Sequence, residues 1–177
     1  MKKMHIRLMI LAKTTIAMLS VGVVLALPHA MAQGMSKIDK TKLVGSWALV
    51  SANVTYPDGK TVQTFGPNDG FVVFETNGRF VQALLRSDIP KIASNNRSTG
   101  SPDENKAVVQ GSLVFFGTYT VNEDGRITRR AERSTFSNLN GTDRDTIITS
   151  LTADELKLRD PAPTIGGAAE QVWKRIK

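Results

Sequence analysis

Short runs of strand-forming residues alternate with turn-forming clusters along most of the chain. Runs rich in Val, Ile, Thr and aromatic residues, bounded by Gly, Pro, Asn and Asp, are typical of β-strands. Several short strands at this spacing favour an antiparallel barrel or sandwich, and we expect eight or nine of them. The runs that follow the pattern are 47–54, 60–65, 71–75, 79–86, 117–121, 126–134, 142–151, 155–159 and 170–176.

The turns and one helix have specific signals. Asn77-Gly78 stands between two strand-like runs, and Asn-Gly in that position predicts a tight hairpin. Ser101, Pro102 and Glu104 form a capping box with proline at the first helical position, which predicts a helix ending by Gly111 or as late as Phe115. A polar loop and this helix together form the connection at 87–111, which is long for a compact barrel. We hypothesise that this segment acts as a lid over one opening of the barrel.

The start of the chain has the pattern of a secretory signal peptide. Basic residues precede an uncharged, mostly apolar run at 14–27, and the small-x-small triplet 30–32 follows. The run is shorter than the ~20 residues of a transmembrane helix, so an uncleaved membrane anchor is the less favoured alternative. We expect cleavage near Ala32-Gln33 and a periplasmic or secreted protein without a stable membrane anchor. The expected parts are a signal peptide at 1–32, a linker at 33–42 and one folded domain at 43–177.

Charge and residue types exclude several kinds of site. The leader holds four of the 23 Lys and Arg and none of the 16 acids, which leaves residues 33–177 at +3 rather than +7. This mild charge, with no aromatic residues between the arginines of 126–133, argues against nucleic-acid binding. The chain has no cysteine, and both histidines, His5 and His29, lie in the leader. We therefore expect no His- or Cys-based catalysis, no metal and no cofactor.

Three segments resemble the bacterial lipocalin-like domain family: LVGSWALVS at 43–51, FGPNDGFVVFETNGRFVQALLRSDIPKIAS at 65–94 and SPDENKAVVQGSLVFFGTYTV at 101–121. They contain a G-x-W opening, an Asn-Gly-Arg hairpin, a Q-x-x-x-R segment and an F-G-x-Y motif. The resemblance extends in order to Arg175 and implies a calycin-type barrel that can hold one small apolar molecule. In that family a histidine is frequent where Arg129 or Arg130 stands here, which implies a different ligand if that position touches one.

The resemblance also implies structural roles at the two ends of the domain. In lipocalin-type barrels the tryptophan of G-x-W closes one end, and an arginine on the last strand packs over it. Gly45, Trp47 and Arg175 match these positions, so we expect a cation–π contact. Trp173, two residues earlier on the same face of the last strand, is the alternative neighbour of Trp47.

Candidate ligand contacts come from the central strands. Gln82 and Arg86 share one face of the run 79–86 with Phe80, and on an inward face they would suit a carboxylate or carbonyl group. Alternatively, Arg86 lies in water at the strand end. The four arginines of 126–133 form either an anion site at the barrel mouth or a solvent-facing run. Aromatic residues line a pocket or fill the core. The candidate ligand-binding residues are Gln82, Arg86, Phe71, Phe80, Phe115, Tyr119 and Arg129.

Three functions stay open from the sequence. The first is binding of a small hydrophobic or amphipathic ligand in the barrel, without catalysis. The second is a barrel isomerase, cyclase or hydrolase using carboxylates with Tyr or Arg. Its candidate carboxylates are Glu75, Asp88 and Glu132, and two carboxylates meeting in a pocket with a raised pKa would favour it. The third is a surface interaction or inhibitor module with a filled barrel.

Overall fold

Residues 38–177, which the computed structural model describes, form one antiparallel sheet of nine strands with a single α-helix. The predicted signal peptide lies outside the described residues, as does the first half of the predicted linker. The elements are η1 (Lys40–Lys42), β1 (Gly45–Thr55), β2 (Thr61–Phe65), β3 (Gly70–Phe74), β4 (Arg79–Leu85), α1 (Pro102–Gly111), β5 (Ser112–Val121), β6 (Arg126–Ser134), η2 (Ser137–Leu139), β7 (Thr142–Leu151), β8 (Glu155–Asp160) and β9 (Ala168–Arg175).

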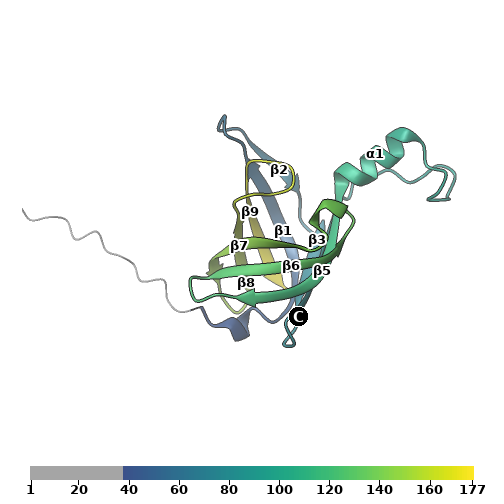
Figure 1. The fold of residues 1–177 in the computed structure, drawn as a ribbon. Coiled ribbons are helices and arrows are strands. Elements are labelled where there is room, and N and C mark those ends of the chain that lie inside the picture. The colour runs from purple at the N-terminus through teal and green to yellow at the C-terminus, as the bar shows by residue number, and fades with distance from the viewer. Residues whose placement is uncertain (1–37) are drawn as a thin grey trace, which may run out of the picture. The chain divides into compact units, whose positions relative to one another are not determined.

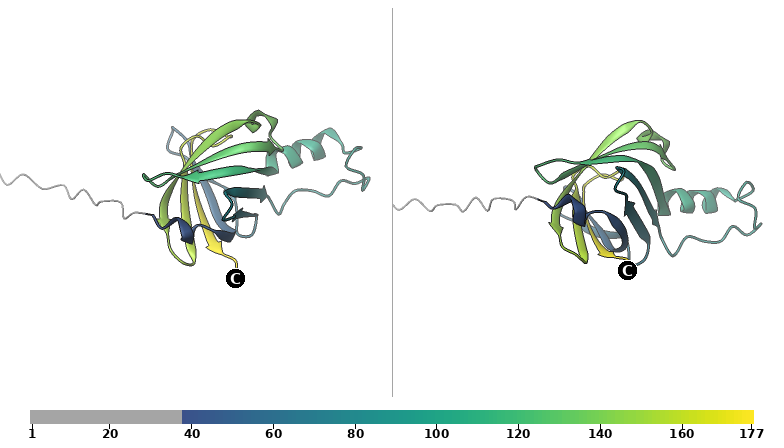
Figure 2. Two further views of the ribbon diagram at one scale, coloured as in Figure 1. Left: turned by 60° about the horizontal axis from the view of Figure 1, so that its bottom comes forward. Right: turned by 90° about the horizontal axis from the view of Figure 1, so that it is seen from below.

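The sheet closes into a barrel because β1 pairs with the last strand, β9, as well as with β3. Eight strands form the ring, which is seen from below in the right view of Figure 2. The ninth strand, β2, pairs only with the second half of β1 and stands outside the ring. The predicted all-β barrel with eight or nine strands and one short helix is confirmed.

The helix begins as predicted, and the strand after it is longer than predicted. Ser101 and Glu104 form the capping box, with Ser101 N donating to the Glu104 carboxylate at 2.7 Å. Helix α1 ends at Gly111, and β5 starts directly at Ser112 rather than at Gly117. The early start follows from pairing, because residues 112–116 bond along β4 up to its last residue, Leu85.

Residues 86–111 form an arm that extends away from the barrel wall (Figures 1 and 2). The two ends of the arm are joined by a bond from Arg86 N to Gly111 O at 2.9 Å. Its loop is tied to α1, since Ala93 N donates to Glu104 Oε1 at 2.8 Å. In this arrangement the arm does not cover an end of the barrel, contrary to the lid hypothesis.

Trp47 and Arg175 lie together at one end of the barrel. Trp47 is fully buried, and its Nε1 donates to Leu43 O at 2.9 Å. Arg175 Cζ lies 4.0 Å from the centroid of the indole ring, which is the predicted cation–π contact. Trp173 is also fully buried, but its Nε1 points to Gln171 Oε1 at 3.2 Å. The partner of Trp47 on the last strand is therefore Arg175.

Arg175 and Gly45 explain the G-x-W pattern. The Arg175 guanidinium donates to three backbone carbonyls: Nε to Ala153 O at 2.5 Å, Nη1 to Val44 O at 2.9 Å, and Nη2 to Lys42 O. Gly45 has a φ of +128°, and a Cβ there would lie 2.5 Å from Arg175 Nη1. A glycine two residues before the tryptophan thus leaves the space in which the arginine crosses to it.

The glycine of the F-G-x-Y motif, Gly117, faces a β-bulge. Phe116 pairs with Arg133 and Gly117 pairs with Ala131, so β6 has one extra residue, Glu132, at this point. A Cβ on Gly117 would overlap the carbonyl oxygen of Arg130. Only glycine allows the two backbones to approach this closely.

Candidate functional site

The barrel strands present alternate residues to the interior. In β6, Ile127, Arg129 and Ala131 are buried, whereas Arg126 and Arg130 are exposed. The same alternation on neighbouring strands brings a polar group into the otherwise apolar core. Its members are Gln82 on β4, Arg129 on β6 and Thr146 on β7, which are 2%, 3% and 0% exposed. We call these three residues the inner polar cluster.

Arg129 is the centre of the inner polar cluster. Its Nη1 donates to Gln82 Oε1 and its Nη2 to Thr146 Oγ1, both at 2.5 Å. Its Nε is buried and has no hydrogen-bond partner among the residues that the structure describes. Two phenyl rings lie against the guanidinium, with centroids 5.1 Å (Phe115) and 5.8 Å (Phe80) from Cζ. The guanidinium is thus held by two neutral acceptors and two aromatic rings.

The charge of Arg129 has no contacting counter-ion among residues 38–177. Burial lowers the pKa of Arg129 to about 10, while Asp160 raises it and Arg144 lowers it further through longer-range charge interactions. A pKa of about 10 keeps the guanidinium charged at neutral pH. The interior therefore contains a cation that only neutral groups touch.

A second polar pair lies on the inner face nearer the other end of the barrel. Arg144 is the cross-strand partner of Arg129, and its Nη2 lies 3.6 Å from Asp160 Oδ2. The Arg144 and Asp160 side chains are 23% and 13% exposed. Asp160 pairs with Ala169, which in turn pairs with Val54 near the end of β1 opposite to Trp47. This pair therefore lies toward the end of the barrel that Trp47 does not occupy.

The family of the chain is shown by its sequence. The lipocalin-like domain model matches residues 44–176, which include all nine strands from Gly45 to Arg175. The chain belongs to the lipocalin-like domain family. A search of curated proteins finds no match.

Three solved structures are similar to this lipocalin-like domain. A lipocalin-like protein from Bacteroides uniformis has 17% identity and a TM-score of 0.44, over 76% of this chain and 99% of that one. A redesigned β-barrel has 14% identity and a TM-score of 0.40, over 77% and 94%. A deswapped triple mutant of bovine odorant binding protein has 16% identity and a TM-score of 0.37, over 76% and 74%.

The structure brings four of the seven predicted ligand-binding residues together inside the lipocalin-like barrel: Gln82, Phe80, Phe115 and Arg129. The rings of Phe80 and Phe115 meet edge to face at 5.3 Å. Tyr119 is the cross-strand partner of Arg129, but it packs against Phe74 with ring centroids 5.0 Å apart. The Tyr119 hydroxyl donates to Glu75 O at 2.9 Å, and burial raises its pKa. Tyr119 thus lies at the edge of the aromatic group rather than at the cluster.

Two predicted ligand-binding residues lie outside the interior. Phe71 is 42% exposed, because Val72 and Phe74 occupy the inward positions of β3. Arg86 follows the last residue of β4 and forms an ion pair with Asp88 at the base of the arm. The alternative prediction for Arg86, a position in water at the end of the strand, is therefore the one that the structure shows.

The arginine run 126–133 divides between the two faces of β6. Arg126 pairs with Asp124 at 3.0 Å and with Asp145 at 3.3 Å, and Arg130 pairs with Asp143 at 3.1 Å, all at exposed positions. Only Arg129 of these points inward. The solvent-facing interpretation therefore describes most of the run, and the anion-site interpretation is left with a single residue.

Sequence reasoning missed Thr146, Arg144 and Asp160. Thr146 and Arg144 lie on the predicted run 142–151, whereas Asp160 lies one residue beyond the predicted run 155–159. On their strands the three residues are in phase with Ile148 and Leu158, which are buried. The signal that could have found them is this alternation, since a polar residue in phase with buried Ile and Leu points to the core.

The three carboxylates considered for catalysis do not meet. Glu75 is exposed beside the β3–β4 hairpin, Asp88 pairs with Arg86, and Glu132 pairs with Arg79 at 2.6 Å. Hydrogen bonds from these arginines lower the pKa of Asp88 and of Glu132. A general acid would need the opposite shift.

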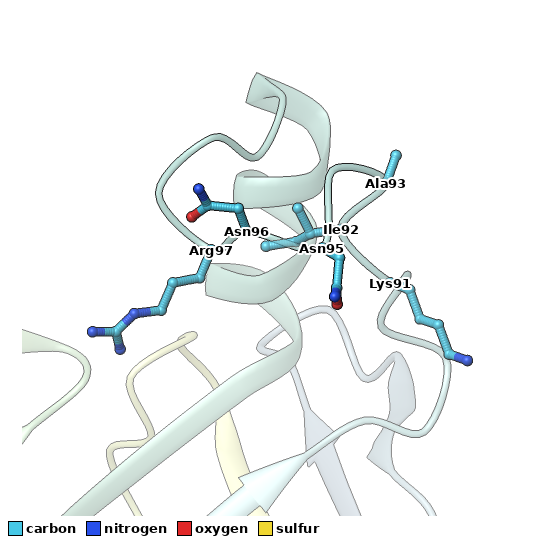
Figure 3. A pocket seen from close by; sticks show the side chains of 6 residues that line it. All are labelled: Lys91, Ile92, Ala93, Asn95, Asn96 and Arg97. Atoms are coloured by element: carbon cyan, nitrogen blue, oxygen red, sulfur yellow. The ribbon is translucent and has the colours of Figure 1, made fainter.

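The remaining surface has a small hollow and an apolar strip. The hollow lies on the arm and is lined by Lys91, Ile92, Ala93, Asn95, Asn96 and Arg97 (Figure 3). Its two cations point to opposite sides and do not converge (Figure 3). On the outer face of β3 to β5, the exposed apolar residues are Phe71, Leu85 and Phe116, the surface that an interaction module would use. The described residues contain no metal-ligand cluster and no helix suited to span a membrane.

Proposed function

We propose that this lipocalin-like protein binds one small amphipathic molecule inside its barrel, without catalysing a reaction on it. The observation that carries the proposal is the Arg129 guanidinium, charged in an apolar interior with an N–H group that no atom of residues 38–177 accepts. Buried polar groups nearly always have a partner, and an unpaired buried charge is costly. A ligand with its polar end at Arg129 and its apolar part against Phe80, Phe115 and Leu84 would supply that partner.

The arrangement of the two ends supports entry from one side. Trp47 and Arg175 fill one end, and the chain segment with Lys42, Leu43 and Val44 is bonded to them. The opposite end carries the partly exposed Arg144–Asp160 pair. A ligand entering there would pass charged groups first and reach the inner polar cluster next.

Native mass spectrometry of protein purified from its own host tests the proposal directly. We expect a non-covalent mass increment of one small molecule, which disappears when the protein is denatured. The stripped protein should then bind N-phenyl-1-naphthylamine, a neutral apolar fluorophore, with increased emission. A protein that never carries a small molecule and does not bind this probe would contradict the proposal.

A matched pair of variants places the binding inside the barrel. Leu84 points inward and is 4% exposed, whereas Leu85, the next residue, points outward and is 47% exposed. Leu84→Trp would fill interior volume and should abolish probe binding, while Leu85→Trp adds the same side chain outside and should leave it intact. Equal loss in both variants would place the probe on the outer surface.

We also propose that the protein is exported, because residues 1–32 have the pattern of a cleavable signal peptide. N-terminal sequencing of protein from periplasmic and culture fractions should find Gln33 as the first residue. A chain that keeps Met1 and stays in the cytosolic fraction would contradict export, and would leave the binding proposal unaffected.

A further inference from the structure

We infer that the molecule bound in the barrel is a monoanionic carboxylate with an apolar tail, and that its carboxylate bonds to the unpaired edge of Arg129. The inference rests on the proposed function and specifies the chemistry of its ligand. It also assigns a role to Asp160, which limits the affinity for that anion.

The donors of Arg129 define where the carboxylate binds. A guanidinium carries five N–H groups in one plane and has no acceptor. Here the two hydrogen bonds go from Nη1 to Gln82 and from Nη2 to Thr146, and Nε has none. A carboxylate that approaches in the plane from the Nε side meets Nε and a neighbouring terminal nitrogen together. This two-bond geometry is the one that carboxylates favour with arginine.

The surroundings of Arg129 select an anion over a neutral polar group. Its present partners, an amide oxygen and a hydroxyl, are neutral, and the two nearest rings are phenyl groups. A charged acceptor bonds to a guanidinium roughly twice as strongly as a neutral one. The low polarity of the interior further increases the difference between them.

The net charge of the inner face favours a ligand with a single negative charge. Arg129 and Arg144 are cross-strand partners on β6 and β7, and the carboxylate that faces them is Asp160 on β8. These three groups together carry one net positive charge, which a monoanion neutralises. A dianion such as a phosphate monoester would instead leave the interior with a buried negative charge, at a cost in desolvation.

Asp160 competes with the ligand for the same positive charges. It pairs with Arg144 at 3.6 Å and acts on Arg129 at longer range. Removing its charge without changing its shape, in Asp160→Asn, should therefore raise the affinity for a carboxylate. A residue that only stabilises the fold would not have this effect.

The inference is tested by calorimetry on the wild-type protein after its ligand has been removed. The probes share one ten-carbon tail and differ in their head group. The probes are decanoate, decanol, decyl phosphate and decyltrimethylammonium, at pH 7.4 and low salt. We expect decanoate to bind roughly 10- to 100-fold more tightly than decanol, as one or two charged hydrogen bonds imply. Decyl phosphate should bind more weakly than decanoate, and the cation weakest.

Matched variants locate the effect. Arg129→Met should remove the preference for decanoate over decanol, while Arg130→Met, which loses an equal charge on the outer face, should keep it. Asp160→Asn should tighten decanoate binding several-fold, whereas Asp143→Asn, an equal change at the exposed pair with Arg130, should not. Arg129→Lys provides a second variant should the methionine variant not fold, and its preference for decanoate should fall without vanishing.

The outcomes separate this inference from the proposed function. Equal binding of decanoate and decanol by the wild type would overturn the carboxylate inference and leave binding in the barrel standing. A decanoate preference that survives in Arg129→Met would also overturn it. Failure of every probe, including N-phenyl-1-naphthylamine, would contradict the proposed function itself.

Discussion

Replacing the inner polar cluster by apolar residues of similar shape should stabilise the ligand-free barrel. The variant is Arg129→Met, Gln82→Met and Thr146→Val, which removes the buried charge and both of its acceptors at once. An isolated interior guanidinium is expected to serve binding at the expense of stability. Its removal should then make the fold stronger and leave the interior without a site for an anion.

The magnitude follows from the burial of Arg129. Its pKa falls from the usual value of a free guanidinium to about 10, and at about 1.4 kcal/mol for each tenfold change in the acid constant the buried charge costs about 3 kcal/mol. Because the folded protein holds this proton less tightly than the unfolded chain, the cost is present at every pH below about 10. It decreases only as the pH rises above that value toward the pKa of a free guanidinium. The measurement therefore belongs at pH 7.

The single variant Arg129→Met should gain much less. It leaves the oxygens of Gln82 and Thr146 buried without a donor, at about 1–3 kcal/mol each, so gain and loss nearly cancel. The triple variant avoids that loss and should exceed the wild type by about 1–4 kcal/mol, as for other buried ionic groups replaced by apolar ones. Its melting temperature should rise by roughly 2–4 °C for each kcal/mol.

Urea unfolding of protein refolded from denaturant, and so free of ligand, gives these free energies. Arg130→Met is the control, because Arg130 and its partner Asp143 are more than half exposed and should contribute little. A triple variant less stable than the wild type, with an unchanged far-ultraviolet circular dichroism spectrum, would refute the reasoning. The hydrogen bonds of Arg129 would then outweigh its burial, and its unpaired N–H would be no sign of a ligand.

Three further predictions concern the glycines and pH. Gly117→Ala places a Cβ on the carbonyl oxygen of Arg130 and should destabilise the fold by more than about 3 kcal/mol in urea unfolding; a loss below about 1 kcal/mol would mean that the bulge adapts. Gly45→Ala should lower the melting temperature and disturb the near-ultraviolet signal of Trp47, since its Cβ would displace Arg175; an unchanged signal would contradict the contact. Decanoate affinity should be constant from pH 6 to 8, where Arg129 stays charged, and fall below about pH 5 as the ligand is protonated; a decline beginning above pH 7 would show that another group controls binding.

The fold was predictable because its turns have local causes. The Asn77-Gly78 hairpin forms with Gly78 at a φ of +80°, and the capping box at Ser101 forms as the sequence indicates. The start of β5 was missed because Leu113 to Phe116 are apolar and follow a helix, so their pattern fits the end of a buried helix as well as a strand. Pairing with β4 decides between the two, and that pairing is not local.

The site was predictable only in part, because the pairing register of a strand decides which of its side chains point into the barrel. The sequence put Gln82 on the same face of its strand as Phe80 and Leu84 without deciding that this face points inward, and in the structure all three are buried. The run FVVF at 71–74 hides its alternation, so Phe71 was assigned to the interior while it lies outside. Arg129 and Arg130 are adjacent, and only the pairing of β6 with its neighbours determines which of them enters the barrel.

The two arginines that contact aromatic rings inside this barrel differ in the way that separates a structural from a binding role. All three nitrogen positions of Arg175 bond to backbone carbonyls, so its charge is satisfied by the fold. Arg129 has two neutral side-chain acceptors and a bare Nε. Arg175→Met should therefore cost about 2–4 kcal/mol of stability by losing three charged hydrogen bonds and a cation–π contact, and leave the decanoate preference intact. Arg129→Met should instead leave the stability nearly unchanged and remove the decanoate preference. If both variants lost stability alike, the distinction between the two sites would fail.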